Sequence, residues 1–340
     1  MSLALIFRRI LFLGTCTLSG LSAQETTING PPNTSSREEI SNGEWAVTAD
    51  FLAWFASEEV ASIWADVITI GDNTSSWEPV NFNFDWDYGF RIGAGYDLAY
   101  DQWDTALSWT WFRTNSSHSI PYNPNATINP EFFAAFLTYD IPKSMDAQWS
   151  ILLNMFDLEL GKNYAVSKDL SLRPFIALKS GWINQSIHVH YYNLTNTHSS
   201  TGNDASEHLK NNFWGVGPLG GINTTWKVRN FKSHFFSLFG NFSMATLWGE
   251  WDCSDVYKNT LPKTSTIDMK VSAIGALMFR GFMGIGWDVD IQKGKQHFST
   301  NLGYEMQIWL DQLRIATFQL QRLHNDLTLQ GITFNCRFDF

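Results

Sequence analysis

The sequence is poor in charge, cysteine and long apolar runs, and each shortage excludes a class of protein. Charged residues make up 16% of the 340 positions and aromatic residues 15%, whereas a disordered chain is rich in charge and poor in aromatics. Three cysteines are too few for a small disulfide-bonded fold. No apolar run of about eighteen residues follows position 23, which excludes a bundle of membrane-spanning helices. Basic residues number 23 against 33 acidic ones, so no nucleic-acid partner is expected.

The first 23 residues have the pattern of a secretory signal. Two arginines precede a short apolar stretch, and small residues then lead to Ala23. The apolar stretch is shorter than the roughly 20 residues that a spanning helix needs. We therefore predict a cleaved signal peptide at 1–23, a polar linker at 24–43 and one folded domain at 44–340.

Beyond the linker, the chain repeats segments of about ten residues in which every second side chain is large and apolar, the pattern of a strand with two different faces. In 84–98 the apolar positions alternate strictly with Asp, Gly and Arg. Further clear segments lie at 103–111, 214–226, 236–248, 298–310 and 332–340. Four segments, at 45–55, 147–160, 172–183 and 276–290, fit less well. For 147–160 we expect a change of phase at a bulge near Asn154.

The links between these ten segments alternate in length. Short links fall near 99–102, 166–171, 229–233 and 291–296, and long ones near 56–83, 114–146, 184–211, 250–275 and 311–326. An outer-membrane barrel has short periplasmic turns and longer extracellular loops. We therefore predict an all-β fold: a transmembrane antiparallel up-and-down β-barrel of about ten strands, or twelve if 60–70 and 267–275 add two more. The long links 57–66 and 310–323 show helical spacing, which predicts a rim helix or a plug.

The chemistry of the two faces favours a barrel in lipid over a soluble β-sandwich. One face is rich in aromatic residues and the other in charge and glycine, as expected for lipid outside and water inside. Tryptophans near strand ends are candidates for interfacial girdles, although a buried or loop position is equally open for several: Trp45, Trp86, Trp103, Trp109, Trp111, Trp149, Trp182, Trp214, Trp226, Trp248, Trp251 and Trp287. Predicted pore-lining charges are Asp85, Asp87, Arg91, Asp104, Arg173, Lys179, Asp288, Asp290, Glu305, Arg337 and Asp339. Seven are acidic and four basic, which indicates at most a mild preference for cations.

Several stretches resemble the Legionella-type major outer membrane protein family, pore-forming porins also found in chlamydia-like bacteria. They are EWAVTADFLAW (44–54), WDYGFRIGAGY (86–96), FDLELGK (156–162), LRPFIALKSGW (172–182), FWGVGPLGG (213–221), LGYEMQIW (302–309) and LQGITFNCRFDF (329–340). The final strand, with Phe338 and Phe340, also resembles the insertion signal that the barrel-assembly machinery reads. The resemblance implies a bacterial outer-membrane location and a pore, with no enzymatic activity.

The functional expectation is thus a porin that lets small hydrophilic solutes or ions diffuse passively, without cofactor or metal. The alternative is a non-conducting structural or adhesin-type barrel whose extracellular loops bind ligands. Hydrolase and metal motifs such as GxSxG, HExxH and CxxC are missing from the sequence. His188 and His190 would share a strand face but lack a third metal ligand nearby. Association into homo-oligomers and a disulfide between Cys253 and Cys336 stay open.

Overall fold

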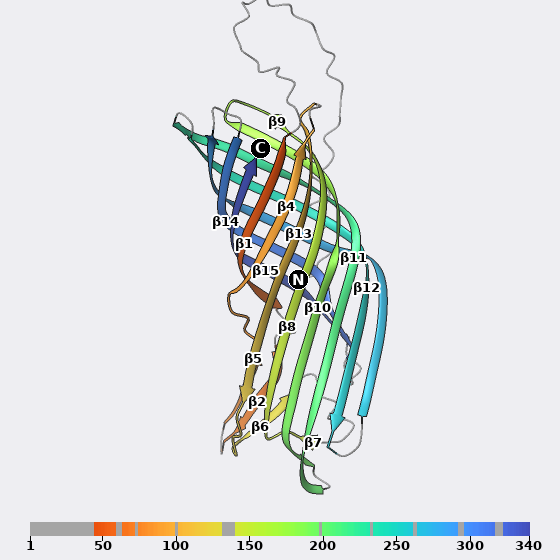
Figure 1. Ribbon diagram of the computed structural model, residues 1–340. Coiled ribbons are helices and arrows are strands. Elements are labelled where there is room, and N and C mark those ends of the chain that lie inside the picture. The colour runs from red at the N-terminus through yellow and green to blue at the C-terminus, as the bar shows by residue number, and fades with distance from the viewer. Residues whose placement is uncertain are drawn as a thin grey trace, which may run out of the picture. The chain divides into compact units, whose positions relative to one another are not determined.

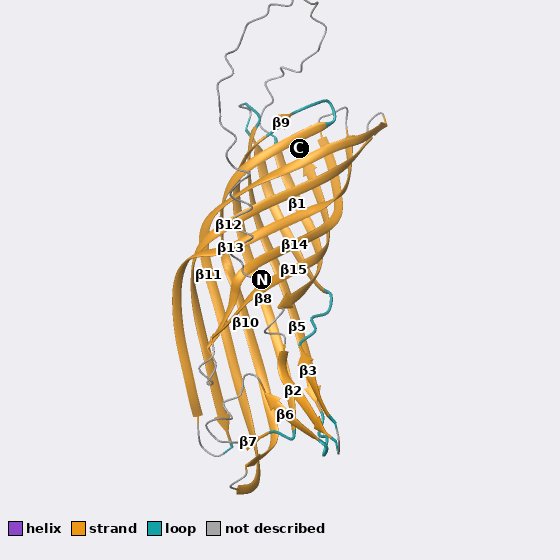
Figure 2. Cartoon of the chain, turned by 180° about the vertical axis from the view of Figure 1, so that it is seen from behind, coloured by secondary structure: helices purple, strands orange, loops and turns teal. Residues whose placement is uncertain are grey.

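A computed structural model describes residues 44–340 apart from nine short gaps, at 59–62, 72–73, 99–100, 131–139, 197–198, 232–233, 261–263, 292–295 and 317–321. The predicted signal peptide and linker lie outside the described residues. The described part consists of strands and the loops that join them (Figure 2). Among these residues, no helix has the length and apolarity that crossing a membrane would require.

Ten long strands form one closed antiparallel barrel, as the alternation of the sequence predicts (Figure 1). β1 pairs with β15 on one side and with β4 on the other, and the β10–β11 ladder completes the ring. In chain order the barrel strands are β1 (Trp45–Glu58), β4 (Asp87–Asp97), β5 (Trp103–Ile120), β8 (Ser144–Lys162), β10 (Leu170–Asn196), β11 (Ser199–Phe231), β12 (His234–Asn259), β13 (Thr264–Ile291), β14 (Gln296–Ala316) and β15 (Arg322–Asp339). Two short strands, β7 (Asp140–Ile141) and β9 (Tyr164–Ala165), pair with β10.

The two ends of the barrel differ because several strands continue far beyond the expected length. β10 has 27 residues and β11 has 33, whereas crossing a membrane takes about 9–11 residues. The prediction of a long loop at 184–211 is wrong. In this stretch β10 and β11 pair with each other, from Asn184 opposite Asn212 to Asn196 opposite Ser199. The region 250–275 likewise belongs largely to β12 and β13. We call this end of the barrel the hairpin end and the opposite one the short-turn end.

Neither stretch with helical spacing contains a helix in its described residues. Residues 63–66 belong to strand β2 (Ile63–Ile70), and residues 310–316 belong to β14. The pairing of β14 with β15 is irregular between Trp309 and Leu313. An irregularity of this kind breaks the period of two, which explains why apolar residues three positions apart imitate a helix there.

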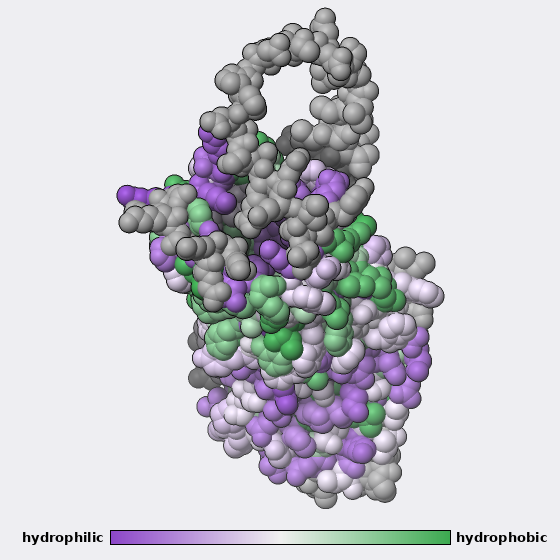
Figure 3. All heavy atoms as spheres, turned by 45° about the horizontal axis from the view of Figure 1, so that its top comes forward, coloured by the Kyte–Doolittle hydropathy of each residue, from purple (hydrophilic) through white to green (hydrophobic). Residues whose placement is uncertain are grey.

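The chemistry of the barrel wall inverts along its length. On β5, the outward side chains change from Leu107, Trp109 and Trp111 to Arg113, Asn115, Ser117 and Ser119. The inward side chains of the same strand change from Asp104, Ala106, Ser108 and Thr110 to Phe112, Thr114, Ser116 and Ile120. Figure 3 shows the same transition on the surface, with a hydrophobic band in one part and hydrophilic residues beyond it. The short-turn half therefore suits lipid outside, and the hairpin half resembles a soluble β-domain with an apolar interior.

The bulge predicted near Asn154 does not occur, and the inversion of the two faces explains the pattern that suggested it. β8 pairs continuously with β5 from Trp103 to Ile120 and with β10 from Phe175 to Tyr192, so its phase never changes. What changes is which face carries the apolar residues: Leu158 and Leu160 point outward, and beyond Asn154 the buried Leu153 and Ile151 point inward. In the sequence, this exchange of faces moves the apolar residues from even to odd positions, which looks like the one-residue shift that a bulge causes.

Outward tryptophans mark the two edges of the apolar band. Trp111, Trp182, Trp214 and Trp248 lie on the hairpin side, and Trp45, Trp103, Trp226 and Trp287 lie near the short turns. On β11 the step from Trp214 to Trp226 is about 40 Å along the strand, and a tilt of roughly 45° reduces it to about 28 Å, close to the ~25 Å band of known barrels. Trp149 and Trp251 do not belong to a girdle, because both are fully buried inside the hairpin half.

A small antiparallel sheet closes a gap in the hairpin half. It consists of β2, β3 (Ser75–Asn81) and β6 (Ala126–Pro130), with β2 in the middle. β4 begins opposite Trp54, so the last residues of β1 have no partner from β4. Trp64 of β2 and the nearby Phe82 fill this region, and the Phe82 ring lies 5.3 Å from that of Trp149. The segment 60–70 thus does contain a strand, but that strand is not part of the barrel wall.

Candidate functional site: the barrel lumen

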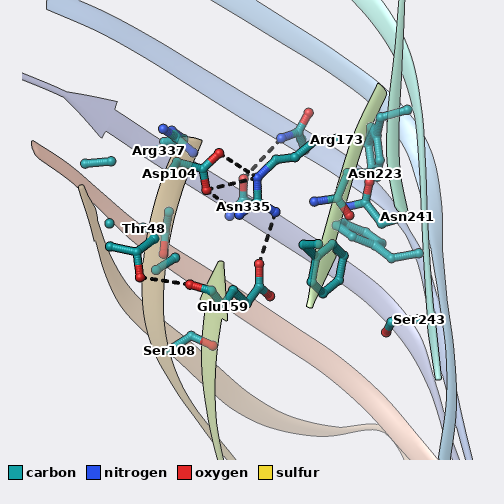
Figure 4. Close-up of a pocket in the computed structure, with 18 of the residues that line it drawn as sticks. Thr48, Asp104, Ser108, Glu159, Arg173, Asn223, Asn241, Ser243, Asn335 and Arg337 are labelled. Carbon is teal, nitrogen blue, oxygen red and sulfur yellow. Dashed lines mark hydrogen bonds and ion pairs between the residues drawn. The ribbon is translucent and has the colours of Figure 1, made fainter. Parts of the chain in front are cut away.

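A polar chamber occupies the lumen of the short-turn half. Its cavity measures about 340 Å³, and residues from β1, β4, β5, β8 and β10 to β15 line it. The inward faces of these strands supply small or polar side chains at the chamber wall, including Thr48, Ser108, Asn223, Asn241 and Asn335 (Figure 4). A second cavity of about 320 Å³ shares Asp104, Arg173 and Arg337 with it and extends to the short-turn rim. The chamber is therefore a hydrophilic space that continues to this rim.

Arg173 projects into the chamber and is held by two carboxylates. Its Nε donates to Asp104 Oδ2 at 2.9 Å, its Nη2 also pairs with Asp104, and its Nη1 donates to Glu159 Oε2 at 3.1 Å (Figure 4). The three side chains are 15–21% exposed. They come from β10, β5 and β8, which are consecutive around the barrel. The guanidinium is thus fixed in place by charge-assisted hydrogen bonds and is not a free cation.

The rim of the short-turn end carries a second charged group. Asp339 lies 3.0 Å from His297 Nδ1 and accepts from Arg337 Nε at 2.8 Å. His297 Nε2 lies 3.7 Å from Asp288 Oδ1, so the imidazole lies between two carboxylates of β13 and β15. These groups are partly exposed, so water and small solutes reach them.

Deeper in the lumen, six charged side chains form what we call the ion-pair layer: Asp50, Arg91, Asp157, Lys179, Arg280 and Glu305. Arg91 donates to Asp50 at 2.7 Å and to Glu305 at 2.8 Å. Arg280 donates to Glu305 at 2.7 Å, and Lys179 donates to both oxygens of Asp157 at 2.7 and 2.9 Å. Thr110 accepts a further hydrogen bond from Arg91 Nε, and Thr333 and Gln307 donate to Glu305.

The ion-pair layer contains three cations and three anions, so its formal charges cancel. Side-chain exposure is 0% for Glu305, 5% for Lys179 and 9% for Arg91. Buried charges need partners and hydrogen bonds to offset the loss of water, and this layer supplies both. The layer therefore forms a rigid, neutral partition across the lumen, without an exposed ring of charge of the kind that selects ions.

Directly beyond the ion-pair layer lies a packed apolar interior, which we call the closing core. Trp54 joins the two regions: its Nε1 donates to Thr333 at 3.0 Å, and Arg91 lies 5.9 Å from its ring. Residues of nine barrel strands and the small sheet meet in one contiguous cluster. Members with at most 1% exposure include Leu52, Trp54, Trp64, Phe112, Trp149, Ile151, Leu153, Ile183, Phe213, Leu247, Trp251, Met278, Trp309, Leu313, Leu327 and Leu329. Water does not reach these side chains, so among the described residues the lumen is closed at this level.

Three carboxyl groups lie inside the hairpin half, close to the closing core. Glu58 is 2% exposed and accepts from Gln185 at 3.3 Å and Asn325 at 2.9 Å. Burial raises the pKa of Glu58 to about 8, against the lowering effect of these two amides. Burial likewise raises the pKa of Asp255 to about 7 and the pKa of Glu207 well above its usual value. The folded chain therefore favours the protonated form of these acids.

The predicted pore-lining residues fall into separate groups. Asp104, Arg173 and Arg337 line the chamber, and Asp288 and Asp339 line its rim. Arg91, Glu305 and Lys179 belong to the buried ion-pair layer, where Arg91 also borders the chamber. Asp290 is exposed near the end of β13, opposite His297. Asp87 begins β4 and accepts from the backbone N–H of Asn115 at 3.3 Å.

The prediction that Asp85 lines the pore is wrong. Asp85 lies outside β4, in the connection 82–86, and is exposed. In the sequence, apolar and polar residues alternate from 84 to 98 and therefore also in this connection, but the pairing of β4 with β1 begins only at Asp87.

Sequence reasoning missed Asp50, Asp157, Glu159, Arg280 and His297. Four of them lie on β1, β8 and β13, whose patterns fitted the period of two less well. The usable signal was the lipid face itself: Val47 and Phe51 of β1 point outward and are about half exposed, at 49% and 53%. Counting from these residues would have placed Asp50 inward. His297 was already on the inward face but was not weighed as a site residue.

The outer surface of the hairpin half brings Ser119, Asp146 and His190 into one row. Asp146 of β8 stands opposite Ser119 of β5 and opposite His190 of β10. Serine and histidine are thus two strand spacings apart, about 10 Å, whereas a nucleophile and its base need direct hydrogen-bond contact. Asp146 accepts from the Tyr192 hydroxyl instead, at 3.1 Å. In the described part of the chain, no three His, Cys, Asp or Glu side chains are grouped to hold a metal, and Cys253 and Cys336 are free thiols.

Comparisons with solved structures find other membrane barrels at low similarity. The outer membrane protease OmpT from Escherichia coli matches with 10% identity and a TM-score of 0.39, covering 87% of this chain and 96% of that one. A Pseudomonas aeruginosa FadL homologue matches with 8% identity, a TM-score of 0.27 and coverage of 88% and 90%. The transport unit of the autotransporter AIDA-I from Escherichia coli matches with 10% identity, a TM-score of 0.28 and coverage of 91% and 93%. All these TM-scores are below 0.5, so they carry no functional argument.

The sequence comparisons give a more specific result. A search of curated proteins finds no match. The profile described as Legionella pneumophila major outer membrane protein precursor matches residues 40–340, which includes every strand of the barrel. Together with the closed barrel and its apolar outer band, this match establishes an outer-membrane protein. The chain belongs to the Legionella pneumophila major outer membrane protein family.

Proposed function

We propose that this chain is a structural outer-membrane barrel that is closed to passive diffusion and presents a folded β-domain outside the cell. The observation that carries the proposal is the closing core, in which Trp54, Trp149, Trp251 and Trp309 are each at most 1% exposed. A hydrated pore has a continuous polar lining. Here the polar chamber ends at a neutral ion-pair layer, and an apolar interior follows it.

The outward face of the hairpin half supports a surface role. Asn115, Ser117, Ser119 and Gln148 lie there, and the inward positions beside them include the buried apolar residues Ile120, Ala147 and Trp149. With the short turns in the periplasm, as in other outer-membrane barrels, this polar face stands outside the cell. It would present a rigid surface to ligands or to neighbouring copies. We propose no enzymatic activity, because Ser119 and His190 are too far apart to act together.

The final strand supports a role in assembly. Ile332, Phe334 and Phe338 lie on the outward face of β15, Phe340 follows the end of this strand, and the rings of Phe338 and Phe340 lie 5.9 Å apart. An aromatic strand of this kind suits capture by the barrel-assembly machinery, which we propose as a partner. The surrounding outer-membrane lipid is the second partner.

Ion conductance tests the closed state. The refolded chain is incorporated into a planar bilayer and recorded in parallel with a general porin, and folding is verified by heat-dependent mobility in cold SDS–PAGE. We expect no discrete current steps from the folded chain, since water does not reach the closing core. Reproducible steps from the folded, unmodified chain would contradict the proposal.

The second candidate is a porin, and the chamber favours it. A polar cavity of about 340 Å³ that continues to the short-turn rim can hold small hydrophilic solutes. Passage would require the inward side chains of the closing core to move apart. The same recording distinguishes the two functions, because a porin would give current steps that grow when Arg173, in the chamber, is replaced by the smaller Ser.

A further inference from the structure

A shallow pocket lies on the outer face of the barrel directly beyond the hairpin-side tryptophans. It measures about 360 Å³, and four neighbouring strands line it: β5, β8, β10 and β11. Its outward polar side chains are Arg113, Ser150, Asn184, Ser186, Lys210 and Asn212. The pocket is remote from the chamber, which lies inside the barrel.

The register fixes the height of this pocket relative to the membrane. Arg113 is two residues beyond Trp111, and Asn184 is two residues beyond Trp182. Asn212 is two residues before Trp214, on a strand that runs the opposite way. One outward step along a strand is about 6.6 Å. Since the tryptophans mark the interface of the bilayer, the pocket lies at the level of the lipid headgroups of the outer leaflet.

Two cations line the pocket without an ion pair among the described residues. Arg113 and Lys210 are both exposed, and neither has a salt bridge there. The next acidic side chain along the same row, Asp252, is already paired with Lys270 at 3.7 Å. The pocket thus combines two uncompensated positive charges with amide and hydroxyl donors.

We propose that this pocket binds the phosphate of an anionic lipid headgroup in the outer leaflet, a phosphorylated glycolipid of the lipid A type. A guanidinium matches the geometry of phosphate oxygens with two parallel hydrogen bonds. Lys210 adds a point charge, and Asn184 and Asn212 donate from their amides. The acyl chains then lie along the aromatic band beneath the pocket, where Trp182 is 41% and Trp214 is 55% exposed. Basic pockets next to a bilayer recognise lipid headgroups in this way.

The test compares lipid A with both phosphates, the same lipid without phosphate, and inorganic phosphate alone. Binding to the refolded full chain in a nonionic detergent is measured by native mass spectrometry and thermophoresis. We expect the doubly phosphorylated lipid to bind at least tenfold more tightly than the dephosphorylated one. We also expect this preference to weaken as salt is added, because exposed charges are screened.

Variants connect the preference to the pocket. Arg113→Gln with Lys210→Gln should reduce the preference to about twofold or less, and Arg113→Lys should retain part of it. The control is Lys168→Gln, which removes an exposed cation in the turn before β10, remote from the pocket, and should leave the preference unchanged. Heat-dependent mobility verifies that each variant is folded.

Three outcomes would overturn the proposal. The double variant would bind the phosphorylated lipid like the unmodified chain, or both lipids would bind equally well, or inorganic phosphate alone would bind as tightly as the lipid. The third outcome would identify a site for free anions instead of lipid. None of these measurements depends on whether the barrel conducts ions, so the failure of one proposal is distinguishable from the failure of the other.

Discussion

Glu58, near the hairpin end of β1, is a carboxylic acid with almost no access to water. It is 2% exposed, and its hydrogen bonds come from the neutral amides of Gln185 and Asn325. No basic side chain donates to it among the described residues. Its situation differs from that of Glu305, which is also buried but contacts two arginines. Burial without a cation favours the protonated acid, and burial with one favours the carboxylate.

Stability should therefore depend on pH through Glu58. Its pKa is raised from 4.5 to about 8 on folding, so between these values the folded chain holds a proton that the unfolded chain has released. The contribution is fully present below pH 4.5 and is lost as the pH rises through about 8. We expect the urea midpoint of the folded chain to be lower at pH 9 than at pH 5.

Glu58→Gln should flatten this pH dependence in part, because Glu207 and Asp255 are raised in the same direction. Glu78→Gln on β3, where the side chain is exposed, is the matched control and should keep the full dependence. An unfolding midpoint that rises between pH 5 and pH 9 would contradict the assignment.

At the scale of elements, the small sheet completes a barrel whose wall is too short on one side. β4 has 11 residues, whereas its neighbour β5 has 18. The space beyond β4 is filled from β2, whose Trp64 is 1% exposed, and by Phe82. Because lipid covers only the short-turn half, this sheet must be held by packing in water.

Trp64→Ala should release the small sheet from the barrel, while the barrel itself stays folded. Replacing a fully buried tryptophan by alanine lowers the free energy of unfolding by about 3–5 kcal/mol. Replacing the exposed Trp77 on the paired strand β3 should change it by no more than about 0.5 kcal/mol. The measurement is limited proteolysis of β2 and β3, together with urea unfolding followed by cold SDS–PAGE. Equal protease resistance of Trp64→Ala and Trp77→Ala would show that the sheet does not depend on this contact.

At the scale of the whole molecule, two environments meet along one set of strands. Leu107 and Ser117 both point outward from β5, but the first lies in the apolar band and the second lies beyond it. The barrel is continuous through this boundary, and only the side chains change. A membrane that covered both positions would place serine, asparagine and arginine in hydrocarbon, which is costly.

Cysteine labelling on intact cells tests this boundary and its direction. Ser117→Cys should react with a membrane-impermeant maleimide added outside, and Leu107→Cys should not. The unmodified chain gives the background, since Cys253 is buried and the partly exposed Cys336 lies between Phe334 and Phe338 on the outward, lipid-facing side of β15. Labelling of Leu107→Cys alone would place the boundary elsewhere, and absence of labelling at Ser117→Cys would place the hairpin end in the periplasm.

The barrel class, the even number of wall strands and the lipid-facing band could be predicted from the sequence, because these depend on local alternation and on aromatic residues at strand ends. The sequence also placed Asp104 and Arg337 inward, since their strands alternate cleanly, and it placed Arg173 inward although the segment 172–183 fits the alternation less well. The tertiary structure was needed to show that, among the described residues, apolar side chains fill the lumen beyond the ion-pair layer. Arg91 contacts Asp50, 41 positions away, and Glu305, 214 positions away, and such pairs follow from strand register around the ring. The exchange of apolar and polar faces along one strand could not be predicted from the sequence either. A period of two shows that the two faces differ, but it does not show whether a given face contacts lipid, water or the barrel interior.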